Sequence, residues 1–299
     1  FAQKSFNPYD PEYYAMDRQQ IRFDDYQVML INYRGFVSPR QYSMTGFAAI
    51  QFLPLSSASY LFNLNFLDNN TGKTVRDDVP RIWEEWIREG RGDDPLGANF
   101  RPNSPLMMVT QDENWQPNAY IRSGTFHKEI YGNWITFSIH SITSVSYNDD
   151  EVFLKLIMKN RSDKPLSLTL IPQQIASRMD CDGMTGSDSS GQIDAFTFGS
   201  GQMHARVASD IRNFNDTGFV LTLPPDKYVT SCFAVKFYKA DLKAPEIYQE
   251  DIGLRMNKAD QITREKLKWA YDKLPKLESS NAMLQEYYYR CMLSVLMSR

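Results

Sequence analysis

Carboxylate side chains are plentiful candidates for chemistry in this sequence, and several stand next to each other. Hydrolysis of a glycosidic bond needs two carboxyl groups roughly 5–10 Å apart, one on each side of the scissile bond. Adjacent acidic residues occur at Asp24-Asp25, Asp77-Asp78, Glu84-Glu85, Asp93-Asp94 and Asp149-Asp150. Neighbouring residues of a strand point to opposite faces, so such a pair is not by itself an acid/base couple. We interpret most of them as solvated turns and retain Asp93 and Asp94, which lie in a long segment flanked by aromatic residues.

Aromatic side chains are the second group of candidates, because flat rings can stack on sugars while amides and carboxylates bind their hydroxyls. The chain has 17 Tyr, 18 Phe and 5 Trp, and most of these are expected in a β-rich core. Trp115 lies in the polar segment 111–118, so the sequence predicts that it is exposed. Trp115, Tyr120, Asp93 and Asp94 are therefore the predicted ligand-binding residues.

The sequence contains no recognisable motif for a metal site, a cofactor site or a catalytic nucleophile. The 3 histidines lack metal-ligand spacing, and His140 falls in an expected strand, where a structural role is the default. The segment 180–188 has oxygen-bearing side chains but departs from the calcium-loop pattern, so a plain loop is expected. The cysteines, Cys181, Cys232 and Cys291, form no CxxC motif, and a bridge between the first two stays open. The sequence predicts no catalytic residue, no metal and no cofactor.

The composition is that of a folded protein. The chain has 299 residues, 42% of them hydrophobic and 23% charged, enough for one large domain or two ordinary ones. Lys plus Arg is 33 and Asp plus Glu is 36, a net charge of −3, which argues against a nucleic-acid partner. Apolar runs are short, so the sequence predicts no membrane span.

Short runs rich in Val, Ile, Phe, Tyr and Thr, separated by turn residues, extend from Ile21 to about residue 237. The segments 152–159 and 166–170, joined by the turn-forming segment 160–165, suggest a hairpin. Many such strands without alternating helices predict a mainly β protein built as a large antiparallel β-sandwich. We place this domain at residues 21–240, after an extended arm at residues 1–20.

A helical and loop insertion is expected over residues 77–120. Val79, Ile82, Trp83, Trp86 and Ile87 have the spacing of one helical face, and the two tryptophans are expected to dock that helix on the sandwich. Prolines and glycines then follow as far as Pro117, and long irregular insertions often carry function. A second loop is expected over residues 180–201.

A linker and a helical tail are expected over residues 241–299. Asp260 could cap a helix that ends at Pro275, and one residue of the segment 279–281 could cap a second helix. Apolar residues from Leu284 to Leu296 form a broad stripe on the second helix, wider than a lone helix of this length needs. The tail therefore suggests the beginning of a helical domain.

A large β-sandwich followed by a helical linker and one further helix resembles the N-terminal part of the six-hairpin (α/α)6-toroid glycoside hydrolases. The segment 276–281, followed by Leu284, Tyr288-Tyr289-Arg290 and Leu293, is similar to the stretch that enters the first toroid helix. The turn at 160–165 also resembles turns of such sandwiches. The resemblance covers the whole chain in architecture, and its sequence motifs lie from Lys276 onward.

The resemblance implies a non-catalytic sandwich region that supports a downstream helical catalytic domain and lends the loop 91–120 to the rim of its active site. In that group the general acid and base come mainly from the toroid, so we expect them beyond Arg299. The implied partner is a poly- or oligosaccharide, and the implied location is secreted or periplasmic. The opening Phe1-Ala2-Gln3 is also compatible with the end of a signal peptide. A stand-alone glycan-binding or structural β-sandwich protein remains the alternative.

Overall fold

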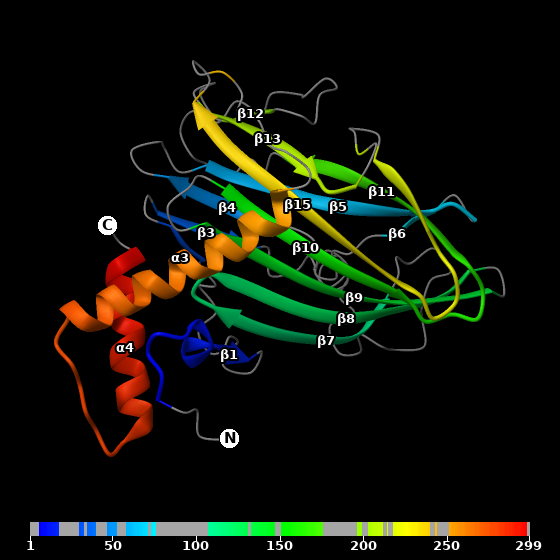
Figure 1. The fold of residues 1–299 in the computed structure, drawn as a ribbon. Helices are drawn as coiled ribbons and strands as arrows, with labels where there is room; N and C mark the ends of the chain where they lie inside the picture. The colour runs from blue at the N-terminus through cyan, green and yellow to red at the C-terminus, as the bar shows by residue number, and fades with distance from the viewer. Residues whose placement is uncertain are drawn as a thin grey trace, which may run out of the picture.

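A computed structural model describes the fold of most of the chain (Figure 1). It describes residues 6–17, 30–32, 35–39, 47–52, 58–70, 73–75, 107–130, 133–146, 151–175, 196–198, 203–211, 214, 218–239, 243 and 251–297.

The described strands form two antiparallel sheets. The larger sheet has eight strands in the order β1-β7-β8-β9-β10-β15-β13-β12, and the smaller has seven, with β6 paired to β5 beside the path β14-β11-β5-β4-β3-β2. The larger sheet contains β1 (Met16–Asp17), β7 (Met107–Gln116), β8 (Ala119–Ile130), β9 (Asn133–Val145), β10 (Glu151–Asn160), β12 (Phe196–Phe198), β13 (Met203–Ser209) and β15 (Tyr228–Lys239). The smaller sheet contains β2 (Leu30–Asn32), β3 (Gly35–Pro39), β4 (Phe47–Phe52), β5 (Ala58–Asp68), β6 (Lys73–Val75), β11 (Leu166–Ile175) and β14 (Phe219–Leu223).

The inner faces of the two sheets pack against each other and form the core. Side chains alternate along the strands, so that Leu156 and Phe233 of the larger sheet and Leu168 of the smaller one are fully buried. Phe219 of the smaller sheet lies 6.4 Å from Phe233, measured between ring centroids, which joins the layers directly. Burial of each such side chain contributes roughly 1.5–3 kcal/mol to the free energy of folding. The predicted fold class, a mainly β antiparallel sandwich, is confirmed.

The expected hairpin between residues 152–159 and 166–170 is wrong, because the two strands belong to different sheets. β10 pairs with β9 and β15, whereas β11 pairs with β5 and β14. The connection is an arch that crosses between the sheets at the strand ends, organised by the fully buried Asn160. Its amide donates to the carbonyls of Lys164 at 2.8 Å and Leu223 at 2.9 Å. Its Oδ1 accepts from the N–H and Oγ of Ser162 at 2.9 and 2.6 Å.

Asn160→Asp is expected to lower the free energy of unfolding by about 2–3 kcal/mol, since it removes two donated hydrogen bonds and places a carboxylate against two buried carbonyls. Ser162→Ala, which removes only one partner of the same amide, should cost about 1 kcal/mol or less. Urea unfolding monitored by fluorescence measures both. Equal costs for the two variants would show that Asn160 does not organise the arch.

The sequence expectation for residues 77–120 is wrong in its last part. Residues 107–116 form β7, and a two-residue turn at Pro117-Asn118 leads into β8. Trp115 is buried between the less buried Asn114 and Gln116, which is the pattern of a strand rather than a loop. The expected helix at 77–90, with Trp83 and Trp86, lies outside the described residues. Of the loop expected at 180–201, the described residues form the short strand β12.

Two described helices follow the sandwich, α3 (Ile252–Lys273) and α4 (Ala282–Met297). α3 begins before the expected cap at Asp260, which lies inside the helix, and it ends ahead of Pro275 as predicted. The interior Asp260 is tolerated because its carboxylate accepts from Asn118 Nδ2 and from Arg264 Nε, at 2.9 and 2.8 Å. α4 starts as predicted, because Asn281 Oδ1 accepts from the N–H groups of the first turn.

α3 lies across the outer face of the larger sheet (Figure 1). Ile252 and Ala259, one face of the helix, pack on outward-facing Phe153 of β10 and on Cys232 and Ala234 of β15. The small side chains of β15 let the helix approach closely. An ion pair between Arg255 in the first turn of α3 and the buried Glu151 at the start of β10 fixes the N-terminal end of the helix.

The N-terminal arm joins this helical layer instead of running free. The short 3-10 helix η1 (Pro11–Tyr14) is capped by Asp10, and β1 pairs with β7 of the larger sheet. Tyr13 and Tyr14 of η1 are buried against Leu267 and Ala270 of α3 and Tyr289 of α4. These five residues are called the arm–helix cluster below. The arm also contacts both helices through its rings, with Phe6 5.9 Å from Tyr289 of α4 and Tyr9 4.9 Å from Tyr271 of α3 between ring centroids, so the arm holds the two helices together.

A polar chain reinforces the clamp. Arg264 of α3 donates to Asp10 of the arm at 2.8 Å and to Asp260 at 2.8 Å. Asp260 in turn accepts from Asn118 in the β7–β8 turn. Polar contacts thus connect the arm, α3 and the larger sheet. The side chain of Arg264 in these contacts is 44% exposed. That exposure limits what its ion pairs contribute.

Tyr289→Ala is expected to lower the free energy of unfolding by about 3–5 kcal/mol and to release the arm, because it leaves a cavity in the middle of the arm–helix cluster. Arg264→Met should cost less than about 1 kcal/mol, since its ion pairs are partly exposed. Limited digestion by chymotrypsin reports release through cleavage at Tyr9 or Tyr13. If Arg264→Met releases the arm as fully as Tyr289→Ala, charge rather than ring packing holds it.

Candidate ligand-binding site

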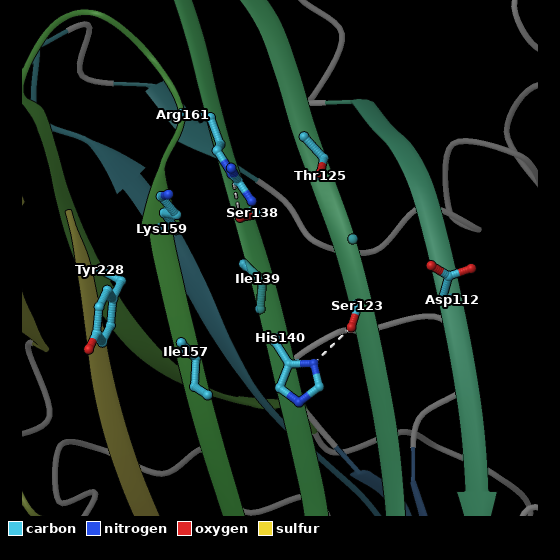
Figure 2. Close-up of a pocket in the computed structure, with 11 residues that line it drawn as sticks. Asp112, Ser123, Thr125, Ser138, Ile139, His140, Ile157, Lys159, Arg161 and Tyr228 are labelled. Carbon is cyan, nitrogen blue, oxygen red and sulfur yellow. Dashed lines mark hydrogen bonds between the residues drawn. The ribbon is translucent and has the colours of Figure 1, made fainter. Parts of the chain in front are cut away.

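The part of the outer face that α3 leaves open contains a hollow of about 520 Å³. Figure 2 shows its floor on β8, β9 and β10, with β7 and β15 at its two sides. The covered and open parts differ in the residues that point outward from β15. Ala234 and Cys232 lie under the helix, whereas Thr230 and Tyr228 continue into the open part. We call this depression the outer hollow.

The sheet register places one row of unlike side chains across the outer hollow. Asp112 pairs with Ser123, Ser123 with His140, and His140 with Ile157. Directly opposed residues on one face have Cβ atoms about 5 Å apart, so these groups can contact one ligand together. The row offers a carboxylate, a hydroxyl, an imidazole and an apolar side chain in sequence.

A second row runs beside the first. Thr125 pairs with Ser138, Ser138 with Lys159, and Lys159 with Tyr228. Arg161 follows β10 and donates from Nε to Ser138 Oγ at 3.2 Å (Figure 2). Hydroxyls therefore cover the floor, and cationic groups stand at the end nearest the arch.

His140 is held in a neutral state. Its Nδ1 lies 2.8 Å from Ser123 Oγ, and it is half-buried (Figure 2). Burial lowers the pKa of the imidazole below its ordinary value, and the positive charge of Lys155 lowers this pKa further. Because Nδ1 is hydrogen-bonded to Ser123, Nε2 is the ring nitrogen that remains for a hydrogen bond to a ligand hydroxyl. The structural role expected for His140 is compatible with the Ser123 contact.

Lys159 and Asp226 form an ion pair of 2.6 Å at the rim of the outer hollow. Asp226 lies in the turn before β15 and has a left-handed backbone, with φ of 59°. The hydrogen bond and charge of Lys159 lower the pKa of the Asp226 carboxyl, and Arg161 and Lys227 lower it less. The carboxyl group of Asp226 is therefore ionised at neutral pH.

Trp115 and Tyr120, two of the four predicted ligand-binding residues, do not line the outer hollow. Trp115 is 5% exposed and Tyr120 is fully buried, so the expectation of exposed rings is wrong. In a strand, the polar neighbours Asn114 and Gln116 point outward while Trp115 points into the sandwich. Asp93 and Asp94 lie outside the described residues. Ligand binding at these four positions stays a prediction.

The inner face near Tyr120 carries a charge that the sequence analysis missed. Arg122 is fully buried, and its guanidinium carbon lies 4.8 Å from the centroid of the Tyr120 ring. The register places Thr143 opposite Tyr120 and Ser141 opposite Arg122. This cluster is enclosed between the sheets, so it contributes to the core rather than to a surface site.

The sequence analysis also missed the residues of the outer hollow, although the sequence contains a signal for one row. β7 and β8 are joined by a two-residue turn at 117–118, and two residues separate the end of β8 from the start of β9. Such turns fix the register, which brings Asp112, Ser123 and His140 into line. The position of β10 beside them has no such local signal.

Other reactive groups in the described structure do not form a site. Cys232 is a free buried thiol, and burial, with a smaller contribution from Asp210, raises its pKa to about 11. Within the described ranges, no group of three or more His, Cys, Asp and Glu side chains could hold a metal ion.

The described helices are too short or too polar to cross a membrane.

The comparisons with known proteins relate this chain to others by fold alone. No protein-family model matches the sequence, and no curated protein matches it. Among solved structures, a protein from the human microbiome described as a kojibiose phosphorylase aligns with a TM-score of 0.52 and 11% identity. The alignment covers 98% of this chain, which spans 41% of the length of that protein. The sandwich and the helices after it therefore share their fold with a region of that larger protein.

A second solved structure is much less similar. A GalM/aldose epimerase homologue from C. elegans aligns with a TM-score of 0.29 and 10% identity, over 71% of this chain and 99% of its own. That score is too low to relate the two folds.

We expect the His140 ring to titrate below the usual imidazole pKa of about 6.5, because burial and Lys155 both disfavour its charged form. Since the unfolded chain then binds the proton more tightly, this group favours folding less as pH falls through the unfolded pKa. Lys155→Met should raise the pKa, and Lys258→Met on the exposed side of α3 should leave it unchanged. Titration of the ring protons by NMR measures the midpoints, and a midpoint at or above 6.5 in the unaltered chain would contradict this assignment.

Proposed function

We propose that this chain is the β-sandwich and linker region of a carbohydrate-active enzyme, and that it supports a helical catalytic domain. The fold shared with a region of the kojibiose phosphorylase supports this proposal. The enzyme would act on a poly- or oligosaccharide, with its catalytic residues in the helical domain. An enzyme of extracellular glycans would be secreted or periplasmic. Residues 241–299 would link the sandwich to the helical domain and begin it.

The observation that carries the proposal is the division of α4 into two apolar faces. One face, with Tyr289 at its centre and Tyr288 and Met292 beside it, packs in and around the arm–helix cluster. The other presents Met283, which is 80% exposed, and Leu284, which is 50% exposed. A helix that is apolar on two sides usually packs between two neighbours. The arm occupies one side, and a further helix would occupy the other.

Hydroxyl-radical footprinting of the isolated chain and of the native protein purified from its source tests this role. Met283 and Leu284 should be oxidised several-fold more slowly in the native protein, because a helical domain would cover them. Tyr228, which is 70% exposed at the start of β15, is the control and should react equally in both samples. Equal oxidation of Met283 in both samples would overturn the scaffold role.

The outer hollow favours a second candidate function, which is glycan binding by the sandwich itself. Asp112 and the hydroxyls of Ser123 and Thr125 are groups that bind sugar hydroxyls, and Nε2 of His140 adds one further hydrogen-bonding group beside them. Tyr228 lines one side with an exposed ring that could stack on a sugar. This function is compatible with the scaffold role, because the two use different parts of the chain.

A further inference from the structure

The outer hollow has positive charges near the arch and a negative charge on its β7 side. Lys159 and Arg161 stand at the end near the arch, with Lys227 in the adjoining turn. Asp226 is the carboxylate beside them, and Asp112 stands on β7 at the far side (Figure 2). Three strand spacings separate β7 from β10, which is about 14 Å. At that distance Asp112 is largely screened from the cationic end.

The two cations can reach a ligand. Arg161 uses only Nε on Ser138 among the described residues, so its two terminal nitrogens remain for a planar anion. Lys159 pairs with Asp226, but the Asp226 side chain is 83% exposed, and such pairs contribute little. A ligand anion that also contacts Arg161 can therefore displace Asp226 from Lys159.

The floor between the charged ends suits the body of a sugar. Ile157 ends the first row, between His140 and Thr230, and offers an apolar contact. The hydroxyls of Ser123, Thr125 and Ser138 lie on one side of it, and the Tyr228 ring lies on the other. A volume of about 520 Å³ is in the range of small-molecule sites.

We infer that the outer hollow binds a saccharide that carries an oxyanion, with Lys159 and Arg161 on the oxyanion and Asp112, Ser123 and His140 on the hydroxyls of the sugar. The shared chemistry is a carboxylate, sulfate or phosphate group attached to a sugar ring. This inference rests on the second candidate function, glycan binding, and specifies its ligand.

The test titrates the folded 299-residue chain with four probes at low and at physiological salt, following the His140 and Tyr228 ring signals by NMR. The probes are a glucuronate-containing disaccharide, a glucose phosphate, a neutral glucose disaccharide and inorganic phosphate. We expect the two charged sugars to bind at least roughly tenfold more tightly than the neutral disaccharide, the difference made by one charge-assisted hydrogen bond. Their affinity should fall as salt rises.

Three variants separate the charges from the fold. Lys159→Met and Arg161→Gln should each weaken binding of the charged sugars by roughly tenfold. Asp226→Asn should strengthen binding several-fold, since it removes the carboxylate that competes for Lys159. Asn tolerates the left-handed backbone at this position, so the turn is kept. Lys258→Met, on the exposed side of α3, is the matched control and should change nothing.

The outcomes distinguish this inference from the function on which it rests. Equal binding of the neutral and the charged sugars would overturn the oxyanion and leave glycan binding in place. Inorganic phosphate that binds as tightly as the glucose phosphate would overturn the saccharide and leave a simple anion site. No shift of either ring with any probe would overturn both the inference and glycan binding, whereas the scaffold role is tested separately by footprinting.

Discussion

The packing of α3 on one half of the larger sheet is the contact on which the rest of the arrangement depends. Ile252 and Ala259 cover Phe153 and Ala234, and this apolar contact fixes where the helix runs. The end of α3 then places α4 and receives the arm through Leu267 and Ala270. Without this contact, the sheet would expose Phe153 and the helices would have no fixed direction.

The same contact decides which part of the sheet stays accessible. Of the outward side chains Phe153, Lys155, Ile157 and Lys159 of β10, α3 packs on Phe153, whereas Ile157 and Lys159 line the outer hollow. The side chains under α3 are small or apolar, and the rows beyond it, which are mostly polar, form the outer hollow. The proposed scaffold role and the proposed ligand site therefore use different parts of the chain, and the two proposals are compatible.

The sequence predicted the sandwich because alternation of buried and exposed residues is a local property of each strand. It did not predict that β10 and β11 lie in different sheets, because alternation shows which face is buried and not which strand lies alongside. Trp115 was misplaced for a related reason, since polar neighbours in a strand point away from it. The row of Asp112, Ser123 and His140 follows from short turns, but its exposure depends on where α3 stops, which only the tertiary structure shows.

The arch at Asn160 also has a consequence for the order in which the chain acquires its fold. The central strands of the larger sheet, β7 to β10, are successive in sequence and pair through short connections, whereas Thr169 of β11 meets Asn69 at a separation of 100 residues. Closing so long a loop costs more entropy, and non-local pairing slows folding. During synthesis, the β7–β10 meander can therefore assemble before β11 has been synthesised. Until then, the edge of β5 that pairs with β11 remains unpaired and can associate with other chains.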